Sequence, residues 1–394
     1  MTLISLLFSL IFVVLTIPVL MFVIEVLGSL LPTKQAENLS DEITPGPIAI
    51  IVPAHNEGEN IRPTLNDIRE QLRPIDRLVV IADNCDDNTA MIAREEGALC
   101  YERNDLVKRG KGYAIEFALQ QLRDNPPEIV MFFDADTRLE ENTCAHLAAN
   151  AHKTNRPVQS LNIMHAGNEA SPRLQVAAFA WLVMNRARMS GLFKIFDTTR
   201  MTGTGMAYPW SLIHDSFKGS GNIVEDLAFT LGLVRDGYAP ILIHETCVHG
   251  EFPNSEEAAV TQRARWEHGT LNVAKTSILP MLGQAITRAD PKLLAMALDL
   301  AIPPLTMQIA LSLGLSMLGI LLALVLSITL PLIIALTGLA LLFGAIIVCW
   351  AVYGRETLPP QAMVGIIGFI LDKFRIYGKS GRQSSASWTR TERD

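Results

Sequence analysis

The stretch Ile129–Thr137 reads IVMFFDADT, five apolar residues followed by two carboxylates set one residue apart. A short apolar run bounded by polar residues is typical of a strand buried on both faces of a parallel sheet. Asp134 and Asp136 then stand at the carboxyl end of that strand, where open α/β sheets bind their ligands. Two carboxylates on one face repel each other unless a cation lies between them, and Mg²⁺ or Mn²⁺ prefers such oxygen ligands. The alternative interpretation is a solvated turn, where Asp is common.

Two earlier apolar runs, Ile48–Val52 and Leu78–Ile81, also predict buried strands. The first runs into the polar segment Pro53–Gly58, and the second is followed by Asp83, where such sheets place an acid against a ribose or base. Helical patterns separate the strands, which predicts an α/β domain with a mostly parallel sheet. Because each predicted strand ends in a polar cluster, these clusters are expected to line one crevice.

A glycine-flanked lysine, Lys111, precedes a predicted helix at Tyr113–Leu122. Flanking glycines allow backbone amides and an ammonium group to approach a phosphate closely. A solvated loop charge is the alternative, since Lys and Gly are common in loops.

The second half of the chain carries three further features. Gly203, Thr204 and Gly205 form a small-residue segment where a ligand or another backbone can come close. Glu225 and Asp226 begin a predicted helix, a position that the helix dipole also favours on structural grounds alone. On a later helix, Gln262, Arg265 and Trp266 share one face. Further elements are expected at Val158–Met164 (strand), Pro172–Ser190 (helix) and Ile241–Ile243 (strand).

Two segments are apolar enough to cross a membrane. Residues 3–31 contain one acid, Glu25, and residues 300–354 contain no charged residue. Because about 20 apolar residues suffice for one span, the first segment is long enough for one span and the second for two. We expect an anchor at 1–31, a linker at 32–47, an α/β domain at 48–270, amphipathic interfacial helices at 271–299, two transmembrane helices at 300–354, and a basic tail at 355–394.

Charge distribution predicts the orientation of these spans. No Lys or Arg precedes the first span, while Lys34 follows it and the tail after the last span carries Lys373, Arg375, Lys379, Arg382, Arg390 and Arg393. The positive-inside rule then places the α/β domain and the tail in the cytoplasm, on a multi-pass protein of the inner (plasma) membrane. Five cysteines without paired spacing fit reduced thiols, and the net charge of −7 argues against a nucleic-acid partner.

Read together, the motifs resemble the membrane-bound glycosyltransferases of family 2, the superfamily of cellulose and hyaluronan synthases, and in particular exopolysaccharide members. The resemblance covers residues 48–270 and rests on motifs in the same order, the most specific being Gln-x-x-Arg-Trp at 262–266. It implies a GT-A-type fold and a UDP-sugar donor. Val224 stands where processive members have Thr, which weakens a polymerase interpretation.

The resemblance also implies roles for single residues. Asp226 would be the general base, with Glu225 beside it, and Asp134 and Asp136 would hold the diphosphate through Mg²⁺ or Mn²⁺. The remaining implied roles are nucleotide binding by Pro53, Ala54, His55, Glu57, Asp83, Lys111 and Asp134, diphosphate and acceptor binding by Gln262, Arg265 and Trp266, and acceptor lining by Gly203, Thr204 and Gly205.

These residue types suit sugar transfer. The sugar–nucleotide bond breaks with negative charge on the diphosphate, which a cation, Arg265 and Lys111 would stabilise. A carboxylate must take the proton of the acceptor hydroxyl, and attack from the face opposite the nucleotide inverts the anomeric centre.

Three expected spans are fewer than polymer-threading synthases use. We therefore expect a single transfer to a polyprenyl-diphosphate-linked or growing saccharide, in contact with membrane lipid and possible polysaccharide-assembly partners. A processive synthase with a partner-built channel is the first alternative. A non-catalytic, membrane-anchored sugar-nucleotide-binding module is the second, and the three carboxylates argue against it. A transporter is disfavoured by the few spans and their lack of intramembrane charge.

Overall fold

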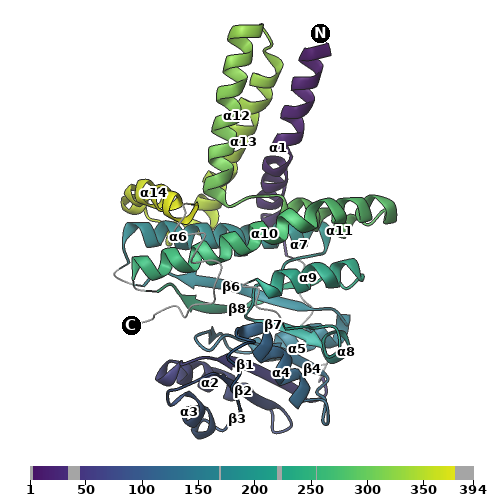
Figure 1. Ribbon diagram of the computed structural model, residues 1–394, viewed down its shortest axis with the longest axis vertical. Coiled ribbons are helices and arrows are strands. Elements are labelled where there is room, and N and C mark those ends of the chain that lie inside the picture. The colour runs from purple at the N-terminus through teal and green to yellow at the C-terminus, as the bar shows by residue number, and fades with distance from the viewer. Residues whose placement is uncertain (1–2, 34–44, 168–169, 220–223, 254, 378–394) are drawn as a thin grey trace. The chain divides into compact units, whose positions relative to one another are not determined.

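The computed structural model describes residues 3–33, 45–167, 170–219, 224–253 and 255–377. These residues form two compact units (Figure 1). The sheet unit comprises Thr33–Gly167 and Asp197–Thr270, and the helical unit comprises Met1–Pro32, Asn168–Phe196 and Leu271–Gly381. Most of the expected linker (34–44) and the end of the expected basic tail (378–394) lie outside the described residues.

The sheet unit is built on one eight-stranded mixed sheet with the order β3-β2-β1-β4-β7-β6-β8-β5. Its mostly parallel α/β architecture confirms the predicted fold class. The strands are β1 (Ile48–Ala54), β2 (Arg77–Asp83), β3 (Leu99–Arg103), β4 (Ile129–Phe132), β5 (Arg138–Leu139), β6 (Val158–His165), β7 (Met206–Pro209) and β8 (Ile241–Glu251).

The half of the sheet formed by β1 to β4 is parallel and brings the carboxyl ends of its strands to one edge. Ala54 at the end of β1 pairs with Ala82 on β2, and Ile51 pairs with Phe132 on β4. Asp83 ends β2, and His55 and Asp134 follow the ends of the neighbouring strands β1 and β4. The predicted strands of this half are confirmed, and the register explains why their polar clusters share one edge.

The other half of the sheet departs from the sequence prediction. β8 runs for eleven residues, well beyond the expected Ile241–Ile243, because it pairs in parallel with β6 across an irregularity between Gln159 and Leu161. The short strands β5 and β7 were not predicted. β7 pairs antiparallel with β4 and β6, and β5 pairs antiparallel with the end of β8.

Helices cover the sheet, and a core of buried apolar side chains lies between sheet and helices. Leu119 and Ile115 of α4 pack here with Val79, Val130 and Phe132 of the strands. The helices of the unit are η1 (Gly58–Ile61), α2 (Arg62–Arg69), α3 (Thr89–Glu95), α4 (Lys111–Gln121), α5 (Thr143–Thr154), α8 (Trp210–Ile213), α9 (Glu225–Arg235) and the first half of α10 (Glu256–Arg288).

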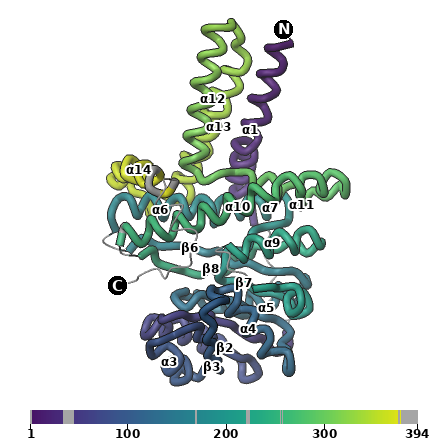
Figure 2. The backbone as a smooth tube through the Cα atoms, in the orientation of Figure 1, coloured from purple at the N-terminus to yellow at the C-terminus, as the bar shows by residue number. Residues whose placement is uncertain are grey.

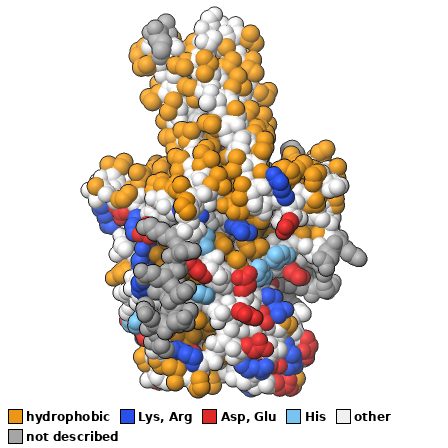
Figure 3. All heavy atoms as spheres, turned by 180° about the vertical axis from the view of Figure 1, so that it is seen from behind, with side chains coloured by type: hydrophobic (Ala, Val, Ile, Leu, Met, Phe, Trp, Pro, Cys, Tyr) orange, Lys and Arg blue, Asp and Glu red, His pale blue; other side chains and the backbone are white. Residues whose placement is uncertain are grey.

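The helical unit contains three helices that are long and apolar enough to cross a membrane: α1 (Leu3–Ser29), α12 (Leu305–Leu326) and α13 with its π-helical end η3 (Leu330–Gly354). They match the three spans expected from the sequence. Figure 2 shows α12 and α13 side by side as a hairpin. Apolar side chains predominate on their surface, as Figure 3 shows for one face.

Shorter helices complete this unit. They are α6 (Pro172–Leu182), the π-helical segment η2 (Val183–Arg188), α7 (Met189–Phe196), the second half of α10, α11 (Pro291–Leu300), η4 (Pro360–Val364) and α14 (Gly365–Tyr377). The single helix expected at Pro172–Ser190 is thus interrupted by η2 and extends to Phe196. The expected interfacial segment at 271–299 is divided between α10 and α11.

A buried ionic cluster joins three parts of the helical unit. Arg188, at the end of η2, lies 2.7 Å from Glu25 Oε2 of α1 and 2.8 Å from Asp299 Oδ1 of α11. All three side chains are buried. The surrounding burial opposes the charge of Arg188, but the two carboxylates outweigh it and raise the pKa of the guanidinium.

Candidate active site

The ends of β1 and β2 hold the first predicted group of site residues. His55 Nδ1 lies 2.7 Å from the carbonyl oxygen of Asp83, which ties the loop after β1 to the end of β2. The backbone amide of Glu57 donates to Thr89 Oγ1 at 2.9 Å, so this loop is also fixed to the start of α3. Pro53 and Ala54 are the last residues of β1. The five predicted nucleotide-binding residues of this edge are therefore neighbours in space.

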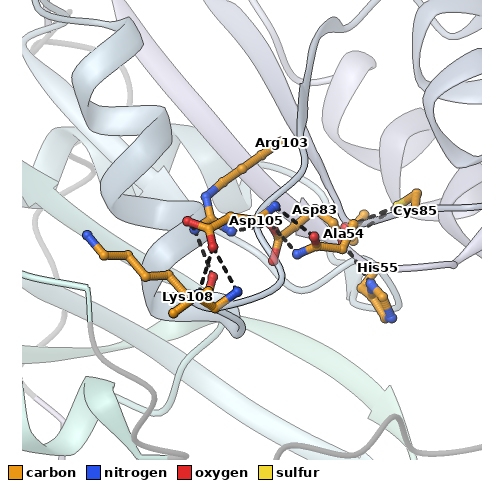
Figure 4. A network of polar contacts seen from close by, with 9 residues as sticks. Ala54, His55, Asp83, Cys85, Arg103, Asp105 and Lys108 are labelled. Atoms are coloured by element: carbon orange, nitrogen blue, oxygen red, sulfur yellow. Dashed lines mark hydrogen bonds and ion pairs between the residues drawn. The ribbon is translucent and has the colours of Figure 1, made fainter.

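Arg103 is a site residue that the sequence analysis missed. Its guanidinium donates to Asp83 Oδ1 at 2.6 Å and to the carbonyl oxygen of Lys108 at 2.7 Å, and both Asp83 and Arg103 are buried. Figure 4 shows Asp83 between His55 and Arg103. Asn84 also donates to Oδ1 at 3.1 Å, so Oδ1 accepts two hydrogen bonds from neighbouring side chains. Arg103 ends the third parallel strand, and this position at the shared edge is the signal that could have identified it.

Lys111 connects two strands of the sheet across the crevice. Its ammonium donates to Asp134 Oδ1 at 2.5 Å and to the carbonyl oxygen of Gly203 at 2.7 Å. Gly110 precedes α4 with φ of 121°, a backbone conformation that favours glycine, and so aims the lysine at the start of the helix toward Asp134. The lysine predicted to approach a phosphate thus lies beside the carboxylate predicted to bind the metal.

The small-residue segment before β7 is held in place by buried polar side chains. Gln159 of β6 donates through Nε2 to the carbonyl of Thr204 at 2.9 Å and accepts from the amide of Thr202 at 2.8 Å. The hydroxyl of Thr204 accepts from the backbone amide of Asp134 at 3.1 Å. At Gly205, φ is 65° and a methyl group would collide with Ser160 and Val248. Gln159 is a second residue that the sequence analysis missed.

Asp226 lies against the same segment. A methyl group built on Gly203 would be 3.3 Å from both Asp226 Oδ2 and Lys111 Nζ. Lys111, Gly203, Glu225 and Asp226 also line one small pocket. The structure therefore brings together the Asp134 edge and the start of α9, which are 92 residues apart in sequence (226 − 134).

Burial changes the proton affinity of this cluster. It raises the pKa of Asp226 to about 6 and that of Glu225 to about 8, although the ammonium of Lys111 lowers both. The pKa of Lys111 is raised, since Asp134, Glu225 and Asp226 outweigh the effect of its burial. At neutral pH Asp226 is therefore ionised and more basic than an ordinary Asp, while Glu225 holds its proton. A carboxylate with a pKa near the working pH is suited to general-base catalysis.

The Gln262, Arg265 and Trp266 face of α10 reaches the cluster indirectly. Gly269 lies on the same helical face and packs closely against Val224. A methyl group built on Gly269 would lie 3.1 Å from the Val224 side chain. Val224 immediately precedes Glu225. Gln262 is buried, and burial lowers the pKa of Arg265. A partly desolvated guanidinium of this kind binds an anion more strongly than one in water.

The two carboxylates after β4, Asp134 and Asp136, are the candidate ligands of a divalent cation. Among the described residues no three His, Cys, Asp or Glu side chains are arranged as a metal site. Mg²⁺ and Mn²⁺ commonly use one or two protein carboxylates and complete their shell with water and substrate phosphates. Asp134 already binds a cationic group, the ammonium of Lys111. The donor set thus suits a cation that arrives with a diphosphate.

Comparison with known proteins identifies the family. Residues 45–269 match the profile described as "Glycosyltransferase like family 2". A curated relative, the probable glycosyltransferase YdaM of Bacillus subtilis, is 24% identical over 242 residues, which are 56% of this chain and 54% of the relative. The 4,4'-diaponeurosporenoate glycosyltransferase of Staphylococcus haemolyticus is 29% identical over 30% of this chain and 32% of its own. The chain therefore spans about half or less of the curated relatives it matches.

A solved structure shares the fold. The mannosyltransferase PcManGT from Pyrobaculum calidifontis, in complex with GDP-Man and Mn²⁺, superposes with a TM-score of 0.53. The match covers 86% of this chain and 98% of that chain at 20% sequence identity. The likeness shows a GT-A-like fold.

Proposed function

The chain belongs to glycosyltransferase family 2 and is a nucleotide-sugar glycosyltransferase, and from this premise we propose that it moves a sugar from a UDP-sugar to a lipid-linked saccharide with inversion, in polysaccharide biosynthesis. The observation that carries the proposal is the convergence of Lys111, Asp134, Gly203 and Asp226. Lys111 Nζ lies 2.5 Å from Asp134, and Gly203 separates it from Asp226. A phosphate-binding cation, a metal-binding carboxylate and a base are thus adjacent.

Each residue then has a step to perform. His55 and Asp83 bind the nucleoside, and Lys111 and Arg265 stabilise the negative charge that develops on the departing diphosphate. A divalent cation held by Asp134 and Asp136 would neutralise the same charge when bound. Asp226 accepts the proton of the acceptor hydroxyl as the new bond forms. Lys111 and Asp226 lie beside each other at Gly203. The acceptor hydroxyl attacks from the face of the sugar opposite the nucleotide in this proposal, and this inverts the anomeric centre.

The acceptor is proposed from the helical unit. Its three long apolar helices support a lipid-linked acceptor rather than a soluble one. We place the sheet unit on the cytoplasmic side of the plasma membrane, as the charge distribution predicts. The same three helices favour a single transfer over processive synthesis, which needs a wider channel.

The test is a donor screen with the purified full-length protein in nanodiscs. UDP-, GDP- and dTDP-sugars are supplied with Mn²⁺, and the released nucleotide is measured with and without a polyprenyl-diphosphate-linked sugar. We expect release with a UDP-sugar, stimulation by the lipid acceptor, and an inverted linkage in the NMR spectrum of the product. Asp226→Asn should bind UDP normally but lose transfer by about 10²-fold or more. Turnover with GDP-sugars alone would reject the uridine assignment, and full activity of Asp226→Asn would reject the base.

A further inference from the structure

A groove runs between the three long helices of the helical unit. The helices α1 and α12 both pack along α13 but hardly touch each other, so α13 forms the floor of the groove. Its volume is about 510 Å³, which lies within the range of small-molecule sites, ~300–1,000 Å³. It is lined by Val14, Leu15, Thr16, Pro18 and Val19 of α1, by residues of α12 between Gln308 and Leu318, by Ala335, Gly338 and Leu339 of α13, and by Ala301 and Pro303 before α12.

Gln308 gives this groove a polar end. Its side chain is only 2% exposed, and among the described residues neither its amide nitrogen nor its amide oxygen has a hydrogen-bond partner. Burying an amide in an apolar environment without partners is unfavourable, because the amide loses its hydrogen bonds to water and gains none. Such a residue within a membrane span is best explained by a ligand that supplies the missing bonds.

A second polar feature lies on the opposite wall. Pro18 of α1 has no backbone N–H, so the carbonyl of Val14 has no donor four residues further along the helix. Both residues line the groove. By contrast, the hydroxyl of Thr16 bonds to the carbonyl of Phe12 at 2.7 Å and is satisfied within its own helix.

The shape of the groove favours a chain molecule. From Gln308 to Leu318 it follows ten residues of α12, about 15 Å at 1.5 Å per residue. Polar Gln308 lies at the end next to Ala301 and Pro303, while Leu315 and Leu318 line the other end. An elongated apolar groove with one polar end fits a lipid chain that carries a polar group at one end.

We propose that this groove binds the isoprenoid chain of the lipid-linked acceptor, with the Gln308 amide hydrogen bonded to the first polar group of the lipid. The inference rests on the proposed function, because it identifies the lipid as the substrate. Gly314 on α12 leaves room for the branched chain, because a methyl group built there would meet no atom within 4 Å.

Two matched glycines make the test sharp. At Gly314, which lines the groove, and at Gly344, which does not, a methyl group would meet no atom within 4 Å. Gly314→Leu should therefore fill the groove without disturbing the packing of the helices. Gly344→Leu adds the same side chain to α13 outside the groove and serves as the control.

The experiment is photolabelling of the full-length protein in phosphatidylglycerol nanodiscs with a polyprenyl phosphate that carries a diazirine in its isoprenoid chain. We expect the label on peptides of α1 and α12. Labelling should fall about tenfold in Gln308→Leu, because one buried hydrogen bond to the lipid is lost. It should fall by a similar factor in Gly314→Leu and stay unchanged in Gly344→Leu. Unlabelled undecaprenyl phosphate should compete, and added phosphatidylglycerol should not.

Equal labelling of Gly314→Leu and Gly344→Leu would overturn the proposal, as would equal competition by phosphatidylglycerol, which would make the groove a bulk-lipid site. Labelling needs no sugar nucleotide. Its failure is therefore distinct from failure of the donor screen, which would overturn the proposed UDP-sugar reaction.

Discussion

Asp226 and Glu225 are adjacent in the chain but hold their protons over different pH ranges. Because burial raises the pKa of Asp226 to about 6 and that of Glu225 to about 8, only Asp226 is ionised at neutral pH. A base that must be ionised loses activity as the pH falls through its pKa, and kcat/KM reports the pKa values of the free enzyme. The two carboxyl groups are thus predicted to control opposite limbs of the pH profile.

We predict that kcat/KM for the sugar nucleotide falls as the pH drops through about 6. Glu225→Gln, which mimics the protonated Glu225, should keep activity at pH 7 and change only the limb near pH 8. Asp226→Asn should be inactive throughout. Because the folded-state pKa values of Asp226 and Glu225 are both raised, ionisation of these groups opposes folding. The Tm of the wild type should therefore fall relative to that of Asp226→Asn as the pH rises through about 6. A pH series of initial rates and melting curves measures both effects, and an unchanged acid limb in Asp226→Asn would contradict the assignment.

A second prediction concerns Arg103 and Asp83, which form a buried ion pair at 2.6 Å. Arg103→Met leaves the Asp83 carboxylate buried without its partner, and breaking a buried pair in this way costs about 3–5 kcal/mol. Arg103→Met combined with Asp83→Asn should recover most of that stability but not UDP binding. Thermal unfolding and UDP titration distinguish these effects, and Arg94→Met, which removes an exposed pair with Glu102, is the control. Equal stability of both single variants would reject the coupling.

Among the elements, the segment between α7 and β7 depends on side chains from elsewhere in the fold. Gln159 on β6 bonds both Thr202 and Thr204, and this places Gly203 between Lys111 and Asp226. The geometry of the site is therefore set by a strand that carries none of the predicted catalytic residues.

We predict that Gln159→Leu lowers kcat more than it raises KM for the donor, because the site loses its alignment rather than a donor contact. Two buried backbone groups lose their partners, at about 1–3 kcal/mol each, so Tm should also fall. Ser160→Ala removes a single bond to Gly205 and should have a smaller effect on both. Steady-state kinetics with melting curves tests this, and an effect of Gln159→Leu on KM alone would contradict it.

The elements also show how far sequence patterns reach. The strands β1, β2 and β4 were predictable because buried parallel strands are continuous apolar runs ending in polar residues. β8 was predicted too short, since His244–Glu251 is polar and its strand conformation comes from pairing with β6. The break at η2 was equally invisible in the local pattern, although it is the segment that ends at Arg188. Lys111 and Asp134 were predicted as site residues from local sequence patterns and Asp226 from the family resemblance, whereas Arg103 and Gln159 act through tertiary contacts that no motif records.

Within the helical unit, Arg188 balances two buried carboxylates on different helices. Arg188→Met would remove the guanidinium that bonds both Glu25 and Asp299, and we predict a loss of about 3–5 kcal/mol in stability. Arg186→Met is the matched control, because Arg186 lies in the same segment but only stacks on Tyr353, with 5.2 Å to the ring centroid. The triple variant Glu25→Gln, Arg188→Met, Asp299→Asn should recover part of the loss. Melting curves in nanodiscs measure the Tm of each variant. Equal Tm values for Arg186→Met and Arg188→Met would contradict the predicted role of Arg188.

At the scale of the whole molecule, the positive-inside rule predicts on which side of the membrane each segment of the chain lies. Fluorescent-protein fusions after residue 381 should be bright, since that fusion point is expected in the cytoplasm. Alkaline phosphatase inserted at 327–329, between α12 and α13, should be active outside. The opposite pattern would place the sheet unit on the extracytoplasmic face and reject the use of cytoplasmic UDP-sugars. Comparison of the two fusions at equal expression gives the measurement.

The division of the chain into units has a practical consequence. The chain passes from one unit to the other after Pro32, Gly167, Phe196 and Thr270, so the residues of the sheet unit are not contiguous. No single truncation can release the transferase portion as a water-soluble fragment, because deleting α6 to α7 would sever β6 from β7. The three long apolar helices call for lipid or detergent during purification, and one proteolytic cut cannot separate the two units.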